Sequence, residues 1–311
     1  MPWRRSNNGP ALLIRPRHPR GDGRLWALVP LTLVLLLTFG FPIVETVRLS
    51  FTDTSLLDPA SARYTLGSYQ WAFDSGALRN SLGVTLVFAV ASLVLQMALG
   101  LGIAVLIDEA ARAGLRGTVA SRTAVVMAWA VPGVVIGVIW GLLYQPTPSG
   151  VINYLLRQVG GSGNVAFLSS PSNALPSVIV ANVWRGTALT MILCYAGLKT
   201  IPSELLEAGR VDGASWPRLF ASITLPLMGP ILLVALIIAT ANEVNTFDML
   251  LALTGGGPGA STQVLALGAY QLIFGSLRLG RGAVIVVCLL AINCAVTAVY
   301  LRWALPRMGG R

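Results

Sequence analysis

Charged residues are scarce in this chain of 311 residues, where they make up only 11% of the sequence. An ordinary soluble domain carries about a quarter of its residues as charges, so this composition excludes that class. Hydrophobic residues reach 55% and the mean hydropathy is +0.73. We therefore expect a protein that lies largely within a lipid bilayer.

Residues typical of catalytic and metal sites are also few. The sequence has a single histidine, His18, and no recognisable nucleophile–base pair, metal-ligand cluster or nucleotide-binding motif. The three cysteines Cys194, Cys288 and Cys294 lie inside apolar runs, with neither a disulfide framework nor a metal-ligand spacing. We expect no catalytic residue, no metal site and no cofactor bound by the chain itself, which argues against a membrane enzyme.

Long apolar runs are what the sequence has in abundance. A helix needs about 20 mostly apolar residues to cross a bilayer, because its backbone polar groups must be satisfied within the helix. The first run has no small-residue cleavage site, so we expect it to be retained rather than removed as a signal peptide. The sequence predicts an all-α, polytopic membrane protein with six transmembrane helices, at about 25–46, 81–107, 123–144, 174–198, 227–251 and 282–301.

The regions outside these runs complete the predicted organisation. Residues 1–24 form a basic tail, 25–305 the six-helix domain with a polar connection at 199–226, and 306–311 a short C-terminus. Pro132-Gly133 predicts a kink in the third span, and Val151–Val159 is a candidate short helix.

The net charge of +10 is distributed unevenly between the two sides of the predicted membrane. Fifteen basic residues fall on the side of the tail and of segment 199–226, and six on the other side. Cytoplasmic loops of membrane proteins carry the excess of lysine and arginine. Both termini and segment 199–226 are therefore predicted to be cytoplasmic, and the tail to contact anionic lipid rather than nucleic acid.

Segment 199–226 has the pattern of two short amphipathic helices. Pro202-Ser203 predicts the start of the first helix, with Ser203 as its cap, and Trp216-Pro217 the start of the second. Gly209 allows a close backbone approach, and Gly213 allows a turn between the helices. The apolar residues that could fill a groove on a partner are Leu205, Leu206 and Val211. A loop that merely adsorbs to lipid is the alternative.

The same segment contains a spaced motif. It reads Glu207-Ala208-Gly209, three residues, Gly213, nine residues, and then Ile223-Thr224-Leu225-Pro226. This resembles the EAA motif of permease subunits from ATP-binding-cassette (ABC) importers, with Gly209 where the family has alanine. The resemblance implies a type I importer permease fold and a coupling helix that docks on a cytosolic ATPase. The residues implied in coupling are Glu207, Ala208, Gly209, Asp212, Gly213 and Ala214.

Two further motifs lie on either side of this one. Trp184 and the run Gly197–Pro202 precede it, and Asn245–Asp248 followed by Leu253–Pro258 comes after it. Together they are similar to the carbohydrate branch of these permeases, the maltose- and glycerol-3-phosphate-type subunits. The resemblance implies a binding-protein-dependent sugar importer in a prokaryotic inner or plasma membrane. Its other parts would be a second, different permease, two ATPases that bind the ATP, and an extracytoplasmic solute-binding protein.

Ionisable groups within a span indicate a functional cavity or a mutual pair, because they are unfavourable in lipid. Arg185 and Glu243 are such groups, and each could bind solute or simply neutralise the other. Ala239, Asn242, Glu243 and Thr246 share one helical stripe. In maltose-type subunits, this stripe and the turn after the tryptophan of the preceding span contact the sugar. The residues implied in solute binding here are Arg185, Gly186, Leu189, Ala239, Asn242, Glu243 and Thr246.

Two other interpretations remain open at this point. An ion-gradient-driven carrier could use Glu243 and Asp248 as proton or sodium sites, but it would not need the motif at 207–226. Asp248 could instead serve the loop after its span. The run Gly255–Pro258 predicts a tight external turn and lacks the Gly-Lys-Ser/Thr ending of a phosphate loop.

Overall fold

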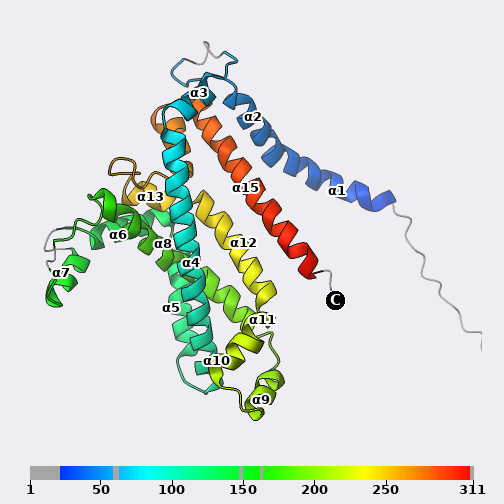
Figure 1. Cartoon of the computed structure of the whole chain (residues 1–311). Helices are drawn as coiled ribbons and strands as arrows, with labels where there is room; N and C mark the ends of the chain where they lie inside the picture. The colour runs from blue at the N-terminus through cyan, green and yellow to red at the C-terminus, as the bar shows by residue number, and fades with distance from the viewer. Residues whose placement is uncertain (1–21, 59–62, 147–149, 162–163, 309–311) are drawn as a thin grey trace, which may run out of the picture. The chain divides into compact units, whose positions relative to one another are not determined.

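The computed structural model of the chain describes residues 22–58, 63–146, 150–161 and 164–308 (Figure 1). Most of the tail predicted at 1–24 and the last residues of the C-terminus lie outside this range. The described residues contain no strand, only the isolated bridges Thr52–Tyr64 and Ser55–Asp58. The predicted all-α class is confirmed. The chain divides into two units, 1–45 and 46–311.

The first unit contains α1 (Asp22–Leu35), the π-helical turn η1 (Leu36–Gly40) and the beginning of α2 (Phe41–Ser50). The hydroxyl of Thr32 donates to the carbonyl of Leu28 at 2.9 Å, and that of Thr38 to the carbonyl of Val34 at 2.7 Å. These bonds to the preceding turn satisfy both hydroxyls within the helix, as an apolar surrounding requires. The stretch Leu28–Ser50 has 23 residues, enough to cross a bilayer.

The second unit holds the remaining helices. In chain order they are α3 (Gly67–Asp74), α4 (Ala77–Arg112), α5 (Thr118–Ala130), α6 (Gly133–Leu143), α7 (Val151–Gln158), α8 (Pro171–Leu198), α9 (Ser203–Val211), α10 (Trp216–Leu219), η3 (Phe220–Thr224), α11 (Leu225–Leu227), α12 (Gly229–Asn245), α13 (Asp248–Leu253), α14 (Leu265–Tyr270), η4 (Gln271–Gly275) and α15 (Leu279–Met308).

Four helices of the described part are long and apolar enough to span a membrane, and two bent pairs raise the number to six. The pair α5–α6 bends by 101° at the predicted Pro132-Gly133 position. This confirms the position, but the bend is far larger than a kink, because Val131 and Pro132 both leave the helical conformation. The second bend, 68° before Gly229, is not predicted by the sequence pattern.

The predicted fifth span at 227–251 is not one helix. α12 ends at Asn245, Thr246 is extended with ψ of 126°, and α13 begins at Asp248. With 17 residues, α12 is about 26 Å long at 1.5 Å per residue. This is shorter than a hydrocarbon core of about 30 Å. α12 alone is therefore slightly shorter than the apolar layer.

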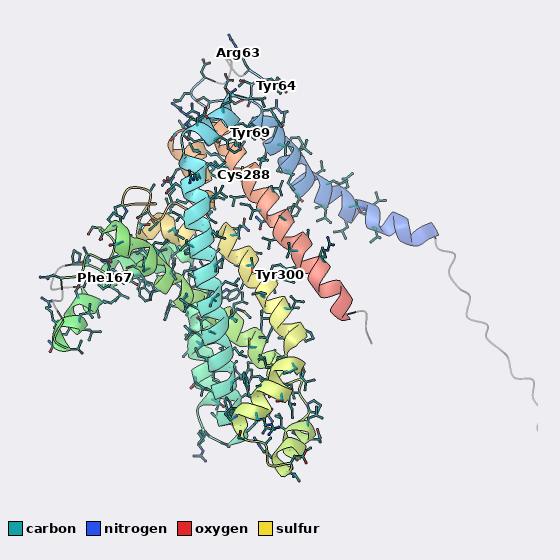
Figure 2. All side chains as sticks on the ribbon, in the orientation of Figure 1. Arg63, Tyr64, Tyr69, Phe167, Cys288 and Tyr300 are labelled. Atoms are coloured by element: carbon teal, nitrogen blue, oxygen red, sulfur yellow. The ribbon has the colours of Figure 1, made fainter. Side chains whose placement is uncertain are left out.

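α4 forms the most extensive packing of the second unit, along α8 (Figure 1). One core cluster joins α4 and α8 to α6 and α13 around Phe88 and Met249. A second cluster joins α4 and α8 to the start of α12 around Met191 and Met228. α15 packs on α12 at the other side, where Thr240 and Tyr300 share a hydrogen bond of 2.8 Å (Figure 2). α4, α8, α12 and α15 thereby form a bundle.

Candidate functional site

A cavity of about 370 Å³ opens between the bundle helices and the break after α12. It is lined by residues of α4, α5, α8, α12 and α13. The structure brings together all seven residues that the resemblance implies in solute binding: Arg185, Gly186, Leu189, Ala239, Asn242, Glu243 and Thr246. Six further residues complete the wall: Gln96, Trp129, Asn182, Asn245, Phe247 and Asp248.

Glu243 is held by two amide side chains from other helices. The Gln96 Nε2 group donates to its Oε1 at 2.9 Å, and the Asn182 Nδ2 group donates to its Oε2 at 2.5 Å. All three side chains are buried, with exposures of 1% for Gln96, 3% for Asn182 and 4% for Glu243. A buried carboxylate needs such partners, because leaving it unpaired is strongly unfavourable. This cluster links α4, α8 and α12 at the cavity wall.

Arg185 has a different partner from the one that the sequence suggested. Its Nη1 lies 3.7 Å from Oδ1 of Asp248, and among the described residues no ion pair joins Arg185 to Glu243. The hypothesis of a mutual Arg185–Glu243 pair is therefore not what the structure shows. Asp248 lines the cavity, so it does not serve only the following loop. Both side chains of the pair are partly exposed to the cavity, at 26% and 37%.

The bend at Pro132-Gly133 makes room for Asp248. A Cβ atom at Gly133 would overlap the Asp248 carboxylate, so a larger residue here would displace that side chain. Farther along α6, a Cβ atom at Gly137 would lie 2.7 Å from the carbonyl oxygen of Met249. Two glycines thus let α6 approach α13 closely and fix the position from which Asp248 faces Arg185.

The coupling segment consists of α9, a turn and α10. α9 begins at Ser203 as predicted, but Ser203 is its first helical residue and its side chain makes no capping bond. Gly213 has φ of +78° and forms the predicted turn, and α10 begins at the predicted Trp216. Glu207, Ala208, Asp212 and Gly213 are exposed, and Gly209 and Ala214 are half-buried.

The inner side of this segment packs on its own chain. Leu206 is buried, whereas Leu205 and Val211 are exposed, so the three apolar residues expected to face a partner are divided. A Cβ atom at Gly209 would overlap the Leu219 side chain, which explains how α9 and α10 approach so closely. Hydrogen bonding to Asp108 raises the pKa of the Lys199 ammonium, which precedes the segment.

The sequence model of the family described as "binding-protein-dependent transport system inner membrane component" matches residues 97–309. The chain belongs to this family. It is 33% identical over 275 residues to the trehalose/maltose transport system permease protein MalF of Thermococcus litoralis, covering 88% of this chain and 91% of the relative. It is 34% identical over 278 residues to the sulfoquinovosyl glycerol transport system permease protein SmoG of Agrobacterium fabrum, covering 88% of each. A third relative is the sn-glycerol-3-phosphate transport system permease protein UgpA of Brucella abortus, at 30% identity over 282 residues, covering 90% of this chain and 94% of the relative.

Solved structures show the same fold for this membrane component. A chain of a bacterial ABC transporter involved in the import of the acidic polysaccharide alginate superimposes with a TM-score of 0.74 at 22% identity, covering 90% of this chain and 96% of that chain. A complex of the alginate transporter with a pentasaccharide-bound periplasmic protein gives 0.76 at 21% identity, covering 90% and 93%. The predicted importer permease fold is confirmed.

The resemblance did not imply six residues of the cavity wall. Three of them, Gln96, Trp129 and Asn182, lie in runs that were identified by their apolar composition, which an amide or indole does not interrupt. An available signal was the position of Gln96 four residues before Gly100, because a polar group in register with a close-packing glycine faces a neighbouring helix.

Proposed function

We propose that this membrane component is one permease subunit of an ATP-driven sugar importer. The observation that carries this function is the connection between the two sites. The helices that wall most of the cavity, α8 and α12, are the two that the exposed α9–α10 segment joins in the chain. A protein that pulls on this segment would move both cavity walls together.

The proposed complex contains a second, different permease, two ABC ATPases and an extracytoplasmic binding protein. Glu207, Ala208, Gly209, Asp212, Gly213 and Ala214 dock on an ATPase, which binds the ATP. The exposure of Glu207 and Asp212 supports this docking, since both carboxylates are free of ion pairs with described residues. In this arrangement, the coupling segment and both termini are cytoplasmic.

The solute binds in the cavity among Arg185, Gly186, Leu189, Ala239, Asn242, Glu243 and Thr246. Its walls combine amides, carboxylates and a guanidinium, which are the donors and acceptors that sugar hydroxyls require. Trp129 adds an aromatic face. The names of the relatives, which include trehalose/maltose and glycerol-3-phosphate systems, support a sugar or a sugar derivative.

The test is purification of the permease with the ATPase and second permease encoded beside it. The ATPase rate is then measured with a binding protein and a panel of neutral sugars, glycerol 3-phosphate and glycerophosphodiesters. We expect the ATPase to co-purify, and one solute class to stimulate hydrolysis. Solute uptake driven by an ion gradient without any ATPase would contradict the proposal.

A further inference from the structure

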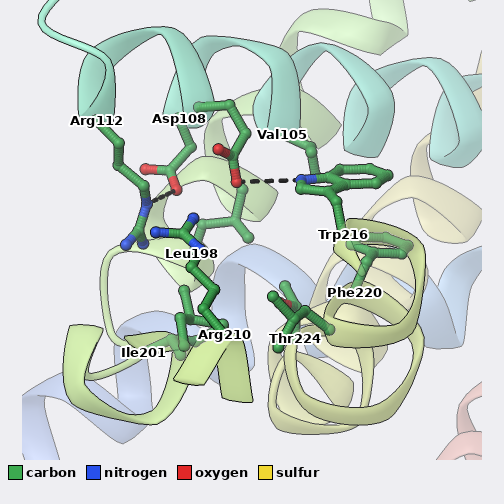
Figure 3. A pocket seen from close by; sticks show the side chains of 12 residues that line it. Val105, Asp108, Arg112, Leu198, Ile201, Arg210, Trp216, Phe220 and Thr224 are labelled. Atoms are coloured by element: carbon green, nitrogen blue, oxygen red, sulfur yellow. Dashed lines mark hydrogen bonds and ion pairs between the residues drawn. The ribbon is translucent and has the colours of Figure 1, made fainter. Parts of the chain in front are cut away.

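The end of α4 contacts the chain just before α9 and again at the start of α10, although α4 is adjacent to neither in the chain. Oδ1 of Asp108 lies 2.6 Å from Nζ of Lys199, just before α9. The next residue, Glu109, accepts a hydrogen bond of 3.3 Å from Nε1 of Trp216, where α10 begins. A small cavity lies between these two contacts. Figure 3 shows Asp108 of α4 and Trp216 of the segment at its wall.

The attachment at Asp108 is buried and doubly paired. Its residue exposure is 3%, and its second oxygen lies 2.7 Å from Nε of Arg112, one turn along α4. The Lys199 side chain is 45% exposed, so the pair is only partly desolvated, but loss of Lys199 would leave the buried carboxylate with Arg112 as its one basic partner among the described residues. The Asp108–Lys199 contact therefore resists separation of α4 from the segment.

α4 connects this attachment to the cavity along a single stripe. Gln96, Gly100, Ala104 and Asp108 follow one another in steps of four and face α8. Ala104 is completely buried, and a Cβ atom at Gly100 would lie 2.6 Å from Cβ of Thr190. The backbones of α4 and α8 are thus in close contact between the polar groups at the two ends of the stripe, which are about 18 Å apart at 1.5 Å per residue.

We propose that α4 transmits movement of the coupling segment to the solute cavity, with Asp108 and Glu109 as the positioning residues that attach the segment to it. This inference rests on the proposed function of the segment. α8 and α12 follow the segment because they are covalently joined to it, whereas α4 is held to it by non-covalent contacts, of which these two are the polar ones. At the other end of the stripe, Gln96 donates a hydrogen bond to Glu243, so a shift of α4 moves this residue of the cavity wall.

The experiment uses the complete transporter in lipid nanodiscs, with the solute among maltose, trehalose and glycerol 3-phosphate that stimulates the wild type most. The measured quantity is the ratio of ATPase rates with and without loaded binding protein. We expect Asp108→Asn and Lys199→Met to lower this ratio about fivefold or more, the lower end of typical coupling factors. Lys199→Arg retains the ratio, and the double variant Asp108→Asn/Lys199→Met is no worse than either single variant.

Arg116→Gln is the matched control, because it removes a charge just after α4 from an exposed side chain that has no ion pair with described residues. Wild-type stimulation in both Asp108→Asn and Lys199→Met would overturn the inference and leave the proposed function intact. A wild-type complex that is not stimulated at all would instead overturn the proposed function.

A second variant serves if Asp108→Asn does not assemble with the ATPase. Glu109→Ala leaves the Asp108 cluster in place and removes only the acceptor of the Trp216 indole. We expect the ratio to fall at least about twofold, the equivalent of one net hydrogen bond. An unchanged ratio in Glu109→Ala would overturn the inference in that case.

Discussion

Gln96 on α4 reaches Glu243 on α12 by passing directly over Gly186 of α8. The Gln96 amide lies where a Cβ atom of residue 186 would be, and its Nε2 donates to Oε1 of Glu243 at 2.9 Å. Three helices are therefore connected through one position that has no side chain. The feature to test is thus space at Gly186 as much as polarity at Gln96 or Glu243.

Gly186→Ala should break this connection. The added methyl group displaces the Gln96 amide and leaves Glu243 with one donor, which we expect to destabilise the protein by about 1–3 kcal/mol. The measurement is the thermal unfolding midpoint of the purified complex, followed by solute uptake. Gly102→Ala on α4 is the control, because nothing lies within 4 Å of its added Cβ atom. Equal midpoints for the two variants would contradict the prediction.

Glu243→Gln tests the orientation of the two donors. A glutamine keeps the size of Glu243 but turns one NH2 group toward a donor amide, so either the Gln96 or the Asn182 bond is lost. We expect reduced uptake, and partial recovery when Asn182→Asp supplies an acceptor. Uptake is measured in proteoliposomes that contain the whole transporter. No recovery with either Asn182→Asp or Gln96→Glu would indicate that Glu243 acts on the solute rather than through its two donors.

Arg185→Leu and Asp248→Asn should have coupled effects. Their side chains are partly exposed and the charged atoms are 3.7 Å apart, so we expect an interaction of about 0.2–1 kcal/mol in a double-mutant cycle of stability. Uptake distinguishes the roles of the two residues. If Arg185 binds solute, Arg185→Leu lowers uptake even in the Asp248→Asn background. Additive stability effects would show that the two charges do not interact.

Gly213→Ala and Gly209→Ala form a matched pair within the coupling segment. Gly213 has φ of +78°, where a side chain introduces about 1–2 kcal/mol of strain. Gly209 is helical, and its added methyl group meets the ends of two flexible side chains, Leu219 and Ile223. We expect Gly213→Ala to weaken co-purification with the ATPase, and Gly209→Ala to retain it. Rescue by Gly213→Asn, which tolerates this conformation, would locate the effect in the turn.

The sequence predicted the helical class, the six apolar runs and the segment boundaries at Ser203 and Trp216. These depend on local signals, namely run length, proline and glycine. It did not predict that α12 ends at Asn245, because apolar residues resume after Asp248 and neither proline nor glycine marks the break. It left open whether Arg185 pairs with Glu243 or binds solute, and did not predict the contact with Asp248, which lies beyond the break after α12.

The sequence predicted which residues line the cavity better than it predicted the contacts between them. All seven that the resemblance implied line one cavity, because a helical stripe keeps its members on one face. The supporting groups on α4 were missed, since nothing in a single chain records which distant helix packs against a glycine. Gln96 and Asp108 are separated from their partners by 147 and 91 positions respectively, beyond the reach of any local pattern.

α12 ends at Asn245, so its last carbonyl oxygens have no further helical turn to bond to them. Side chains bond back to two oxygens near this end, since Asn245 donates to the carbonyl of Ala241 and Thr246 to that of Asn242. These bonds do not involve a guest molecule. The end of α12 can therefore release a bound solute without leaving those two oxygens unpaired. A transporter must release its solute in every cycle, and these internal hydrogen bonds make that release less unfavourable.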